Sequence, residues 1–359
     1  MSASISNQLP DTLEFETPKH AFFVKSWGQL LQAMIYAISK KERTAIVLLI
    51  TPEFLAGSSC RFKDSEYIRF VPVDPKRALI PIQAFITQQF LTREEISVAI
   101  WLQDYDVQLH TFSPANDIAL YKRDDIIVHD AGDYSRMRID KQLPDSDNQS
   151  VYRIYLKELP LDYNPATDKK VRTWDYMQAL RDLSAEEADI ILDTFNVRTI
   201  ATGDKDVLFL HSEPEAEKFT QAQIDHIHYL VSVLCEHLIA EGYTVWFKGH
   251  PKRFWLPKGV EGLRYIPHFL PAELLTLNVD GNFEYIASVR SSAVDTLCTE
   301  TGCKAVNGIS VHAKKAYKLG NLRHIRTQGY HAYKKGLLRV ARALLTNQDI
   351  LRLWETWCR

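Results

Sequence analysis

The pattern of apolar and polar positions predicts strands and helices in alternation. An apolar run at residues 20–24 is followed by a helical stripe over 29–38 and by the wholly apolar run 44–50. The stripe has the spacing of one buried helix face. An unbroken apolar run is typical of a parallel strand that is covered on both sides. Strand, helix and buried strand in close succession predict a βαβ unit and an α/β fold.

The first half of the chain continues in the same way and is expected to end near residue 200. A polar loop is expected at 139–150, and short helices are expected over 151–200, with a capping box at 184–187. Near residue 200, the turn-forming sequence 202–205 precedes a new strand. The other elements expected before that point are strands at 67–71, 97–102, 107–109 and 125–128 and a helix at 82–90.

The second half predicts another α/β unit with its own strands and helices. The expected strands are 206–211, 243–247, 283–289 and 304–309, and the expected helices are 220–240, 293–298, 329–344 and 349–357. The domains are therefore expected at 1–200 and 201–345, with a closing helix in 346–359. Core packing and interfacial membrane contact are both open for the closing helix.

Composition limits the classes of function. At 359 residues the chain is long for a single core, which favours two domains. Apolar residues make up 46% and charged residues 25%, as in an ordinary globular protein. The net charge of −2 gives no basic excess, so nucleic acid is not an expected partner.

The cysteines and the N-terminus indicate a protein of a reducing compartment. The five cysteines show no paired metal-type spacing, so a zinc site is not expected. Their odd number fits free thiols in the cytoplasm. The polar first twenty residues do not resemble a signal peptide, and no apolar run reaches the length of a membrane-spanning helix.

Candidate chemistry gathers after two strands of the second half. The loop Lys248-Gly249-His250-Pro251 follows the strand 243–247, and Ser291-Ser292 stands between the strand 283–289 and the next helix. We expect both loops at the carboxyl ends of neighbouring strands, where open α/β sheets bind ligands. Cations, hydroxyls and free N–H groups at a helix start would suit a nucleotide phosphate. A simple turn and a helix N-cap are the alternatives.

A second polar loop follows the strand 125–128. His129, Asp130 and Asp133 surround Gly132 at a strand end, which suggests a functional loop. A solvated turn is the alternative, because Asp and Gly are common turn residues.

These motifs together resemble the bacterial sialyltransferases and polysialyltransferases that act on lipooligosaccharide and capsule. The segment 23–33, with Ser26, Gln29 and two leucines, is similar to their first strand–loop–helix. Asp130-Ala131-Gly132 stands where the family has an acidic-acidic-glycine motif. His250-Pro251 and Ser291-Ser292 match its His-Pro and Ser-Ser motifs. The chain departs from the pattern at Trp27 and Ala131, which replace a proline and an acidic residue.

The resemblance implies a GT-B glycosyltransferase with two Rossmann-like domains that face a central cleft. The N-terminal domain would bind the acceptor, and the C-terminal domain would bind the nucleotide sugar. The implied reaction moves a nonulosonic acid, such as sialic or pseudaminic acid, from its CMP-activated form to a hydroxyl of a bacterial surface glycan. The transfer would invert the anomeric carbon without a metal or a cofactor. The implied place is the cytoplasm, with possible peripheral contact with the inner membrane.

The family's residue roles carry over to the matching positions. Asp130 would be the base, although Asp133 stays open for that role, and His250 would meet the charge on the departing phosphate. Ser291 and Ser292 would hold the same phosphate, and Glu273 resembles the acidic residue that binds the ribose; an exposed helix-start glutamate is its alternative. Further substrate-binding candidates are Ser26, Gln29, Gly132, Asp133, Lys248 and Pro251.

Two other functions stay open. The first is another GT-B transferase of the cell envelope, which would use a Kdo or glycerophosphate donor. The second is a non-catalytic glycan-binding protein with the same fold, which the alanine at position 131 allows.

Overall fold

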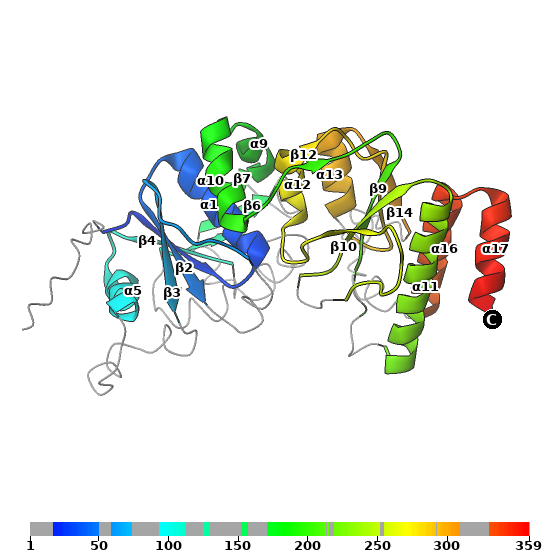
Figure 1. The fold of residues 1–359 in the computed structure, drawn as a ribbon. Helices are drawn as coiled ribbons and strands as arrows, with labels where there is room; N and C mark the ends of the chain where they lie inside the picture. Colours follow the sequence, from blue (N-terminus) through cyan, green and yellow to red (C-terminus); the bar gives the residue numbers. More distant parts are fainter. Residues whose placement is uncertain are drawn as a thin grey trace, which may run out of the picture. The chain divides into compact units, whose positions relative to one another are not determined.

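The computed structural model divides the chain into two compact units. The N-terminal unit comprises Met1–Thr51 and Lys63–Ala179, and the C-terminal unit comprises Pro52–Phe62 and Leu180–Arg359 (Figure 1). The residues that the structure describes are 17–49, 59–73, 93–112, 125–129, 152–156, 171–212, 214, 219–251, 255–291, 293–308 and 330–358.

The division between the units falls about twenty residues before the expected boundary near 200. Two hydrogen bonds link the segment after residue 179 to the C-terminal unit. The Arg61 N–H donates to the Thr194 carbonyl at 2.7 Å, and Asn278 Nδ2 donates to the Arg198 carbonyl at 3.1 Å. That the N-terminal domain binds the acceptor and the C-terminal domain binds the nucleotide sugar stays a prediction.

The N-terminal unit contains a seven-stranded parallel sheet in the order β3-β2-β1-β4-β5-β6-β7. The strand order reverses between β1 and β4, as in a doubly wound fold. Its strands are β1 (His20–Val24), β2 (Thr44–Leu49), β3 (Ile68–Val73), β4 (Gln108–Thr111), β5 (Ile127–His129), β6 (Tyr152–Leu156) and β7 (Val171–Trp174).

Helices cover both faces of this sheet. Helix α5 (Arg93–Gln103) contributes Val98 and Trp101 to a core that also contains Ala21 and Phe23 of β1. Phe22 lies on the opposite face of β1, because neighbouring residues of a strand point to opposite faces. There its ring contacts Tyr36 of α1 (Trp27–Lys40), with centroids 5.1 Å apart.

The C-terminal unit repeats the same topology with five parallel strands in the order β11-β10-β9-β13-β14. The order reverses between β9 and β13. The strands are β9 (Asp206–Leu210), β10 (Thr244–Lys248), β11 (Arg264–Ile266), β13 (Tyr285–Ser288) and β14 (Lys304–Asn307). A separate pair is formed by β8 (Ile200–Ala201) and β12 (Val279–Asp280). The α/β class and the two Rossmann-like units expected from the sequence are confirmed.

The remaining elements within the described residues are helices. They are α9 (Tyr176–Arg181), α10 (Ala185–Phe195), α11 (Gln221–Ala240), η1 (Ala272–Leu274), α12 (Leu275–Asn278), α13 (Ala293–Thr301), α16 (Tyr330–Leu344) and α17 (Asn347–Cys358). Two of them begin at a capping box, in which a hydroxyl at the N-cap and a side chain at N3 each accept a backbone N–H. Ser184 pairs with Glu187 at α10, as expected, and Thr220 pairs with Gln223 at α11.

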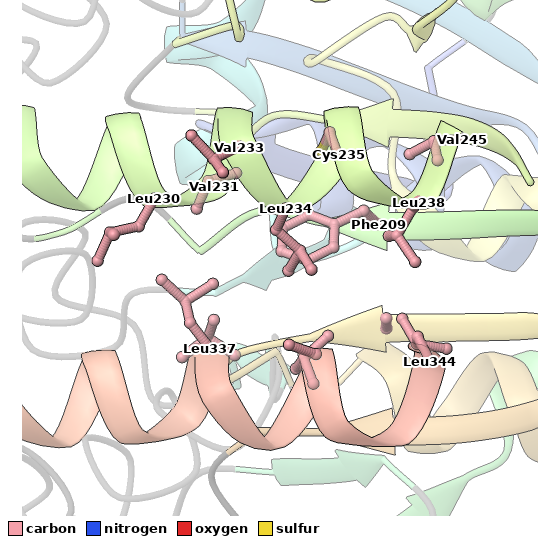
Figure 2. Packing of buried hydrophobic residues seen from close by; sticks show 14 of the residues in the cluster. Phe209, Leu230, Val231, Val233, Leu234, Cys235, Leu238, Val245, Leu337 and Leu344 are labelled. Atoms are coloured by element: carbon pink, nitrogen blue, oxygen red, sulfur yellow. The ribbon is translucent and has the colours of Figure 1, made fainter. Parts of the chain in front are cut away.

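A hydrophobic core of the C-terminal unit lies between one face of its sheet and the helices α11, α16 and α17. Figure 2 shows Leu230 and Leu234 of α11 facing Leu337 and Leu344 of α16. Burial of each such leucine contributes roughly 1.5–3 kcal/mol. Alternate residues of β9, including Phe209, complete this core from the sheet.

The last helix joins this core, so core packing, one of the two fates left open for it, is confirmed. Leu353 and Trp357 of α17 are buried in the cluster, whereas Leu351 is 64% exposed. No helix in the described ranges is both long and apolar enough to cross a membrane.

Two expectations about secondary structure are wrong. Residues 97–102 lie inside helix α5, where the buried positions Val98 and Trp101 have helical spacing and Ile100 is exposed. A short apolar run does not distinguish a strand from a buried helix segment. In the stretch 151–200 the structure has the strands β6 and β7 as well as helices. The expected helix 82–90 and loop 139–150 lie outside the described residues.

Candidate functional site

The candidate phosphate site lies at the carboxyl edge of the C-terminal sheet. Its two loops follow β10 and β13. These strands were expected to be neighbours, but β9 lies between them in the sheet. The sequence did not indicate this position, because β9 precedes both strands in the chain. His211 directly follows β9, and its N–H donates to the Lys248 carbonyl at 2.9 Å. Three strand ends therefore contribute to the candidate site, which includes the topological switch point.

The hydroxyl of Ser288 fixes the start of the loop after β13. It donates to the Leu210 carbonyl at 2.7 Å and accepts the N–H groups of Arg290 at 3.3 Å and Ser291 at 3.1 Å. Ser288 is fully buried. Because one hydroxyl ties the end of β9 to the turn after β13, it holds the backbone of the predicted serine motif in place.

Ser291 has the geometry of a helix-start residue. Its Oγ accepts the Ala293 N–H at 3.3 Å, directly before α13, and its own N–H is bonded to Ser288. The backbone N–H that was expected to hold a phosphate is thus used within the protein. The hydroxyl can still donate its hydrogen to an anion, since a hydroxyl both donates and accepts. Ser292 lies outside the described residues.

Lys248 is the most unusual residue of the site because it is a buried cation. It ends β10, is only 5% exposed, and its Nζ donates to the His268 carbonyl at 3.3 Å. Burial lowers the pKa of Lys248 to about 8, and the charge of Glu273 opposes that shift. An anionic ligand would stabilise the charged form of this lysine, because a nearby opposite charge offsets the solvation lost on burial.

Three other predicted residues belong to the surroundings of this lysine. His250 and Pro251 follow it after Gly249 and are half-buried. Glu273 is the middle residue of η1 and is also half-buried, so it is not the exposed helix-start residue of its alternative interpretation. Burial, followed by the charge of Lys248, lowers the pKa of His268.

Arg290 adds a second cation next to the serine motif. Its guanidinium lies 5.7 Å from the centroid of the Tyr333 ring, and the Tyr333 hydroxyl donates to the Ser212 carbonyl at 2.8 Å. Tyr333 thus connects the loop after β9 with Arg290 after β13. This contact positions the guanidinium beside the loop that the sequence proposed for phosphate binding.

Aromatic rings gather near the end of β9 and β10. Trp255 stacks on His228 with ring centroids 4.0 Å apart, and His211 lies 5.1 Å from Trp255 and 5.6 Å from Phe247. These contacts give the histidine after β9 an apolar surrounding.

In the N-terminal unit, Ser26 and Gln29 form a helix cap. Ser26 Oγ accepts the Gln29 N–H at 3.4 Å, and Gln29 Oε1 accepts the Lys25 N–H at 2.7 Å. Both residues follow β1, one of the two strands at the switch point of this sheet. The cap accounts for both residue types at this spacing, and their role in substrate binding stays a prediction.

The predicted base loop is placed only by its first residue. His129 ends β5 at the same carboxyl edge. Asp130, Gly132 and Asp133 lie outside the described residues. Among the residues that are described, no group of three or more His, Cys, Asp and Glu side chains is arranged to hold a metal ion.

A cavity of about 260 Å³ lies elsewhere in the C-terminal unit. Its wall includes Leu208 and Ile286 together with the ion pair of Arg181 and Glu300. The predicted site residues that the structure describes do not line it. We therefore separate this cavity from the candidate phosphate site.

Several residues of the site were not found from the sequence. Arg290 directly precedes the serine motif, and its charge was the available signal. Ser288 could have been noticed as a serine in an apolar strand. His211 and His268 gave no local signal, because their role depends on which strands are neighbours.

Comparisons with known proteins give similarity in structure only. No protein-family model and no curated protein matches the chain. The chain is similar to a His-to-Ala variant of the wall teichoic acid polymerase TagF, with a TM-score of 0.44 and 12% identity over 97% of this chain and 86% of that one. For a His-to-Asn variant of TagF soaked with CDPG, the TM-score is 0.37 and the sequence identity is 10%, over 97% of this chain and 90% of that one. The fold class therefore rests on the strand orders of the two sheets themselves.

Proposed function

We propose that the protein is an inverting, metal-independent transferase of the GT-B plan that uses a cytidine-activated donor. The donor of the main proposal is a CMP-activated nonulosonic acid, and the acceptor is a hydroxyl of a bacterial surface glycan. The motifs at 23–33, 130–132, 250–251 and 291–292 support this choice.

The observation that carries the proposal is the buried cation at the carboxyl edge of the second sheet. Lys248 is the last residue of β10, which lies on one side of β9. Arg290 follows β13, which lies on the other side of β9. Two cations on the strands that flank β9 suit the phosphate of a nucleotide. The position is the one at which open α/β sheets bind their ligands.

The same charges would assist departure of the nucleotide. When the bond between the sugar and CMP breaks, negative charge builds on the phosphate oxygen. Lys248 and Arg290 would stabilise that charge, and His250 would donate a hydrogen bond or a proton to it. Glu273, half-buried and near enough to Lys248 to influence its pKa, is proposed to bind the ribose hydroxyls.

A glycerophosphate donor is the second candidate. His-Pro and serine pairs are also used by transferases of cell-envelope polymers, and the TagF structures are of a wall teichoic acid polymerase. A CDP-linked glycerol would place two phosphates, not one, at the same edge. Both donors would release CMP, but a different bond breaks: carbon–oxygen in the first case and phosphorus–oxygen in the second.

A donor panel tests the proposal. CMP release would be measured with CMP-activated sialic, pseudaminic and legionaminic acids, CMP-Kdo and CDP-glycerol, each with a surface glycan acceptor. The main proposal expects turnover with a CMP-nonulosonate that EDTA does not abolish. Turnover with CDP-glycerol or CMP-Kdo alone would select another donor.

The panel needs a control for catalysis at the proposed site. Lys248→Met should lose CMP release, whereas Lys304→Met, which removes an exposed lysine of the same unit, should keep it. If CMP stabilises the protein against heat but no donor turns over, the glycan-binding alternative is supported. A protein that UDP or GDP stabilises equally well would contradict the cytidine donor.

A further inference from the structure

Four side chains of the N-terminal unit form one continuous series of hydrogen bonds. Glu42 Oε2 lies 2.7 Å from His20 Nε2, and His20 Nδ1 lies 2.9 Å from His110 Nε2. His110 Nδ1 in turn lies 2.8 Å from His129 Nε2. In each imidazole, Nε2 therefore faces the Glu42 end of the series and Nδ1 faces the other end. The series joins a carboxylate to His129, the last residue of β5.

The series crosses the sheet from its amino edge to its carboxyl edge. His20 is the first residue of β1, and His110 on β4 stands opposite Phe22, two positions further along. His110 stands opposite Ile127 on β5, and His129 is again two positions further. Steps of two residues keep all three side chains on one face of the sheet.

The two ends of the series have different surroundings. The Glu42 side chain is 34% exposed and pairs with Lys19 at 3.0 Å. His110 and His129 are fully buried. Phe22 stacks on His110 at 4.0 Å, and the Tyr36 ring lies 5.0 Å from that of His110.

Burial keeps the inner imidazoles neutral. Burial, followed by the neighbouring histidines, lowers the pKa of His110 well below its ordinary value and that of His129 to about 3. Among the described residues, the ionisable groups with a recorded contact near the series are Glu42 and Lys19 at its open end, Tyr36 of α1, and Lys40, which lies 5.9 Å from the Tyr36 ring.

The carboxylate sets the positions of the protons. Hydrogen bonds from His20 and Lys19 lower the pKa of Glu42, so at neutral pH it is ionised and only accepts. A neutral imidazole at His20 then carries its proton on Nε2 and accepts on Nδ1. The same order repeats at His110 and His129, which leaves His129 Nδ1 without a proton.

This last nitrogen is placed at the predicted base loop. His129 Nδ1 is buried and has no hydrogen-bond partner among the residues described. Asp130 follows it directly in the sequence. The series therefore ends in a nitrogen that can accept a proton at the carboxyl edge of the sheet.

We propose that Glu42 and the three histidines form a proton path, which accepts a proton at His129 Nδ1 and releases it to solvent at Glu42. As the route for the proton of the acceptor hydroxyl, the path rests on the proposed function. As a proton-accepting series, it stands on the contacts of the N-terminal unit alone.

Proton transfer along the path is balanced and leaves no net charge in the core. One proton bonds to His129 Nδ1, and each imidazole passes its Nε2 proton to the next group. The Glu42 carboxylate takes the last proton, and all three imidazoles stay neutral with the hydrogen now on Nδ1. The buried groups thus avoid the cost of an unpaired interior charge.

Nitrogen NMR of ¹⁵N-histidine-labelled full-length protein tests the path without any substrate. At pH 7.5 His110 and His129 should be neutral, and Nδ1 should be unprotonated in all three histidines. Glu42→Gln should remove the preference for a proton on Nε2, because a glutamine can face His20 with either its oxygen, which accepts, or its NH₂ group, which donates. Part of the His129 population should then carry its proton on Nδ1. Glu284→Gln changes a similar lysine-paired carboxylate in the other unit and should leave the signals unchanged.

Two results would overturn the path. One is a wild-type protein with the His129 proton on Nδ1, which needs no variant. The other is a folded Glu42→Gln variant, judged by thermal unfolding, whose histidine signals equal those of the wild type. Where transfer is measured, Glu42→Gln should lower kcat and change its pH profile, whereas Glu284→Gln should not. Unchanged kcat and pH profile would remove the path from the reaction but leave the proposed transferase intact.

Discussion

Lys248 links the electrostatics of the candidate site to a measurable pH dependence. Its pKa of about 8 in the free protein is lowered by burial, and a bound phosphate would raise it. CMP should therefore bind most tightly below pH 8, and its affinity should fall by about tenfold per pH unit above that value. Calorimetric titrations from pH 7 to 10 measure this directly.

The matched variant for that titration is Lys248→Arg. A guanidinium stays charged over the whole range, so its affinity for CMP should not fall above pH 8. If wild type and variant lose affinity in parallel, the ionisation of Lys248 does not control CMP binding.

His250 is predicted to act on the leaving phosphate. His250→Ala should lower kcat by roughly a hundredfold, as for a lost acid or oxyanion donor, and should weaken CMP binding much less. Steady-state kinetics together with CMP titration separate the two effects. A folded variant that works near the wild-type rate would exclude His250 from the mechanism.

At the scale of elements, the approach of β14 to α16 depends on a glycine. A Cβ added to Gly308 would lie 2.4 Å from the Gly336 carbonyl oxygen, so the strand end and the helix backbone would have to separate. Gly308→Ala should destabilise the C-terminal unit by about 1–3 kcal/mol. Urea unfolding followed by circular dichroism measures this change.

Gly28 provides the opposite case. It lies in α1, and nothing stands within 4 Å of an added Cβ. Gly28→Ala should stabilise the N-terminal unit by roughly 0.5–1 kcal/mol, because alanine loses less backbone entropy in a helix. Equal effects of the two substitutions would contradict the close approach at Gly308.

The elements that the sequence predicted best have a strong local signal. The apolar run at 44–49 and the capping box at Ser184 were predicted from the sequence, because neighbours along the chain decide them. Residues 97–102 of helix α5 were mistaken for a strand because a run of five apolar residues fits both structures. The position of β9 between the two candidate loops depends on strand order, which no local pattern encodes.

At the scale of the whole molecule, the proposal assigns the acceptor base to the N-terminal unit and CMP to the C-terminal unit. Asp130→Asn should then abolish transfer, since an amide cannot take the acceptor proton. Asp133→Asn should keep measurable activity. Product analysis with a turnover-competent donor distinguishes the two, and the reverse pattern would assign the base to Asp133.

The binding of CMP to three variants, measured by calorimetry at pH 7, tests the proposed donor site most directly. Lys248→Met should bind CMP much more weakly than the wild type, whereas Asp130→Asn and the exposed-lysine control Lys304→Met should bind it as well as the wild type. Loss of CMP binding in Asp130→Asn, or full affinity in Lys248→Met, would contradict a donor site at the carboxyl edge of the C-terminal sheet.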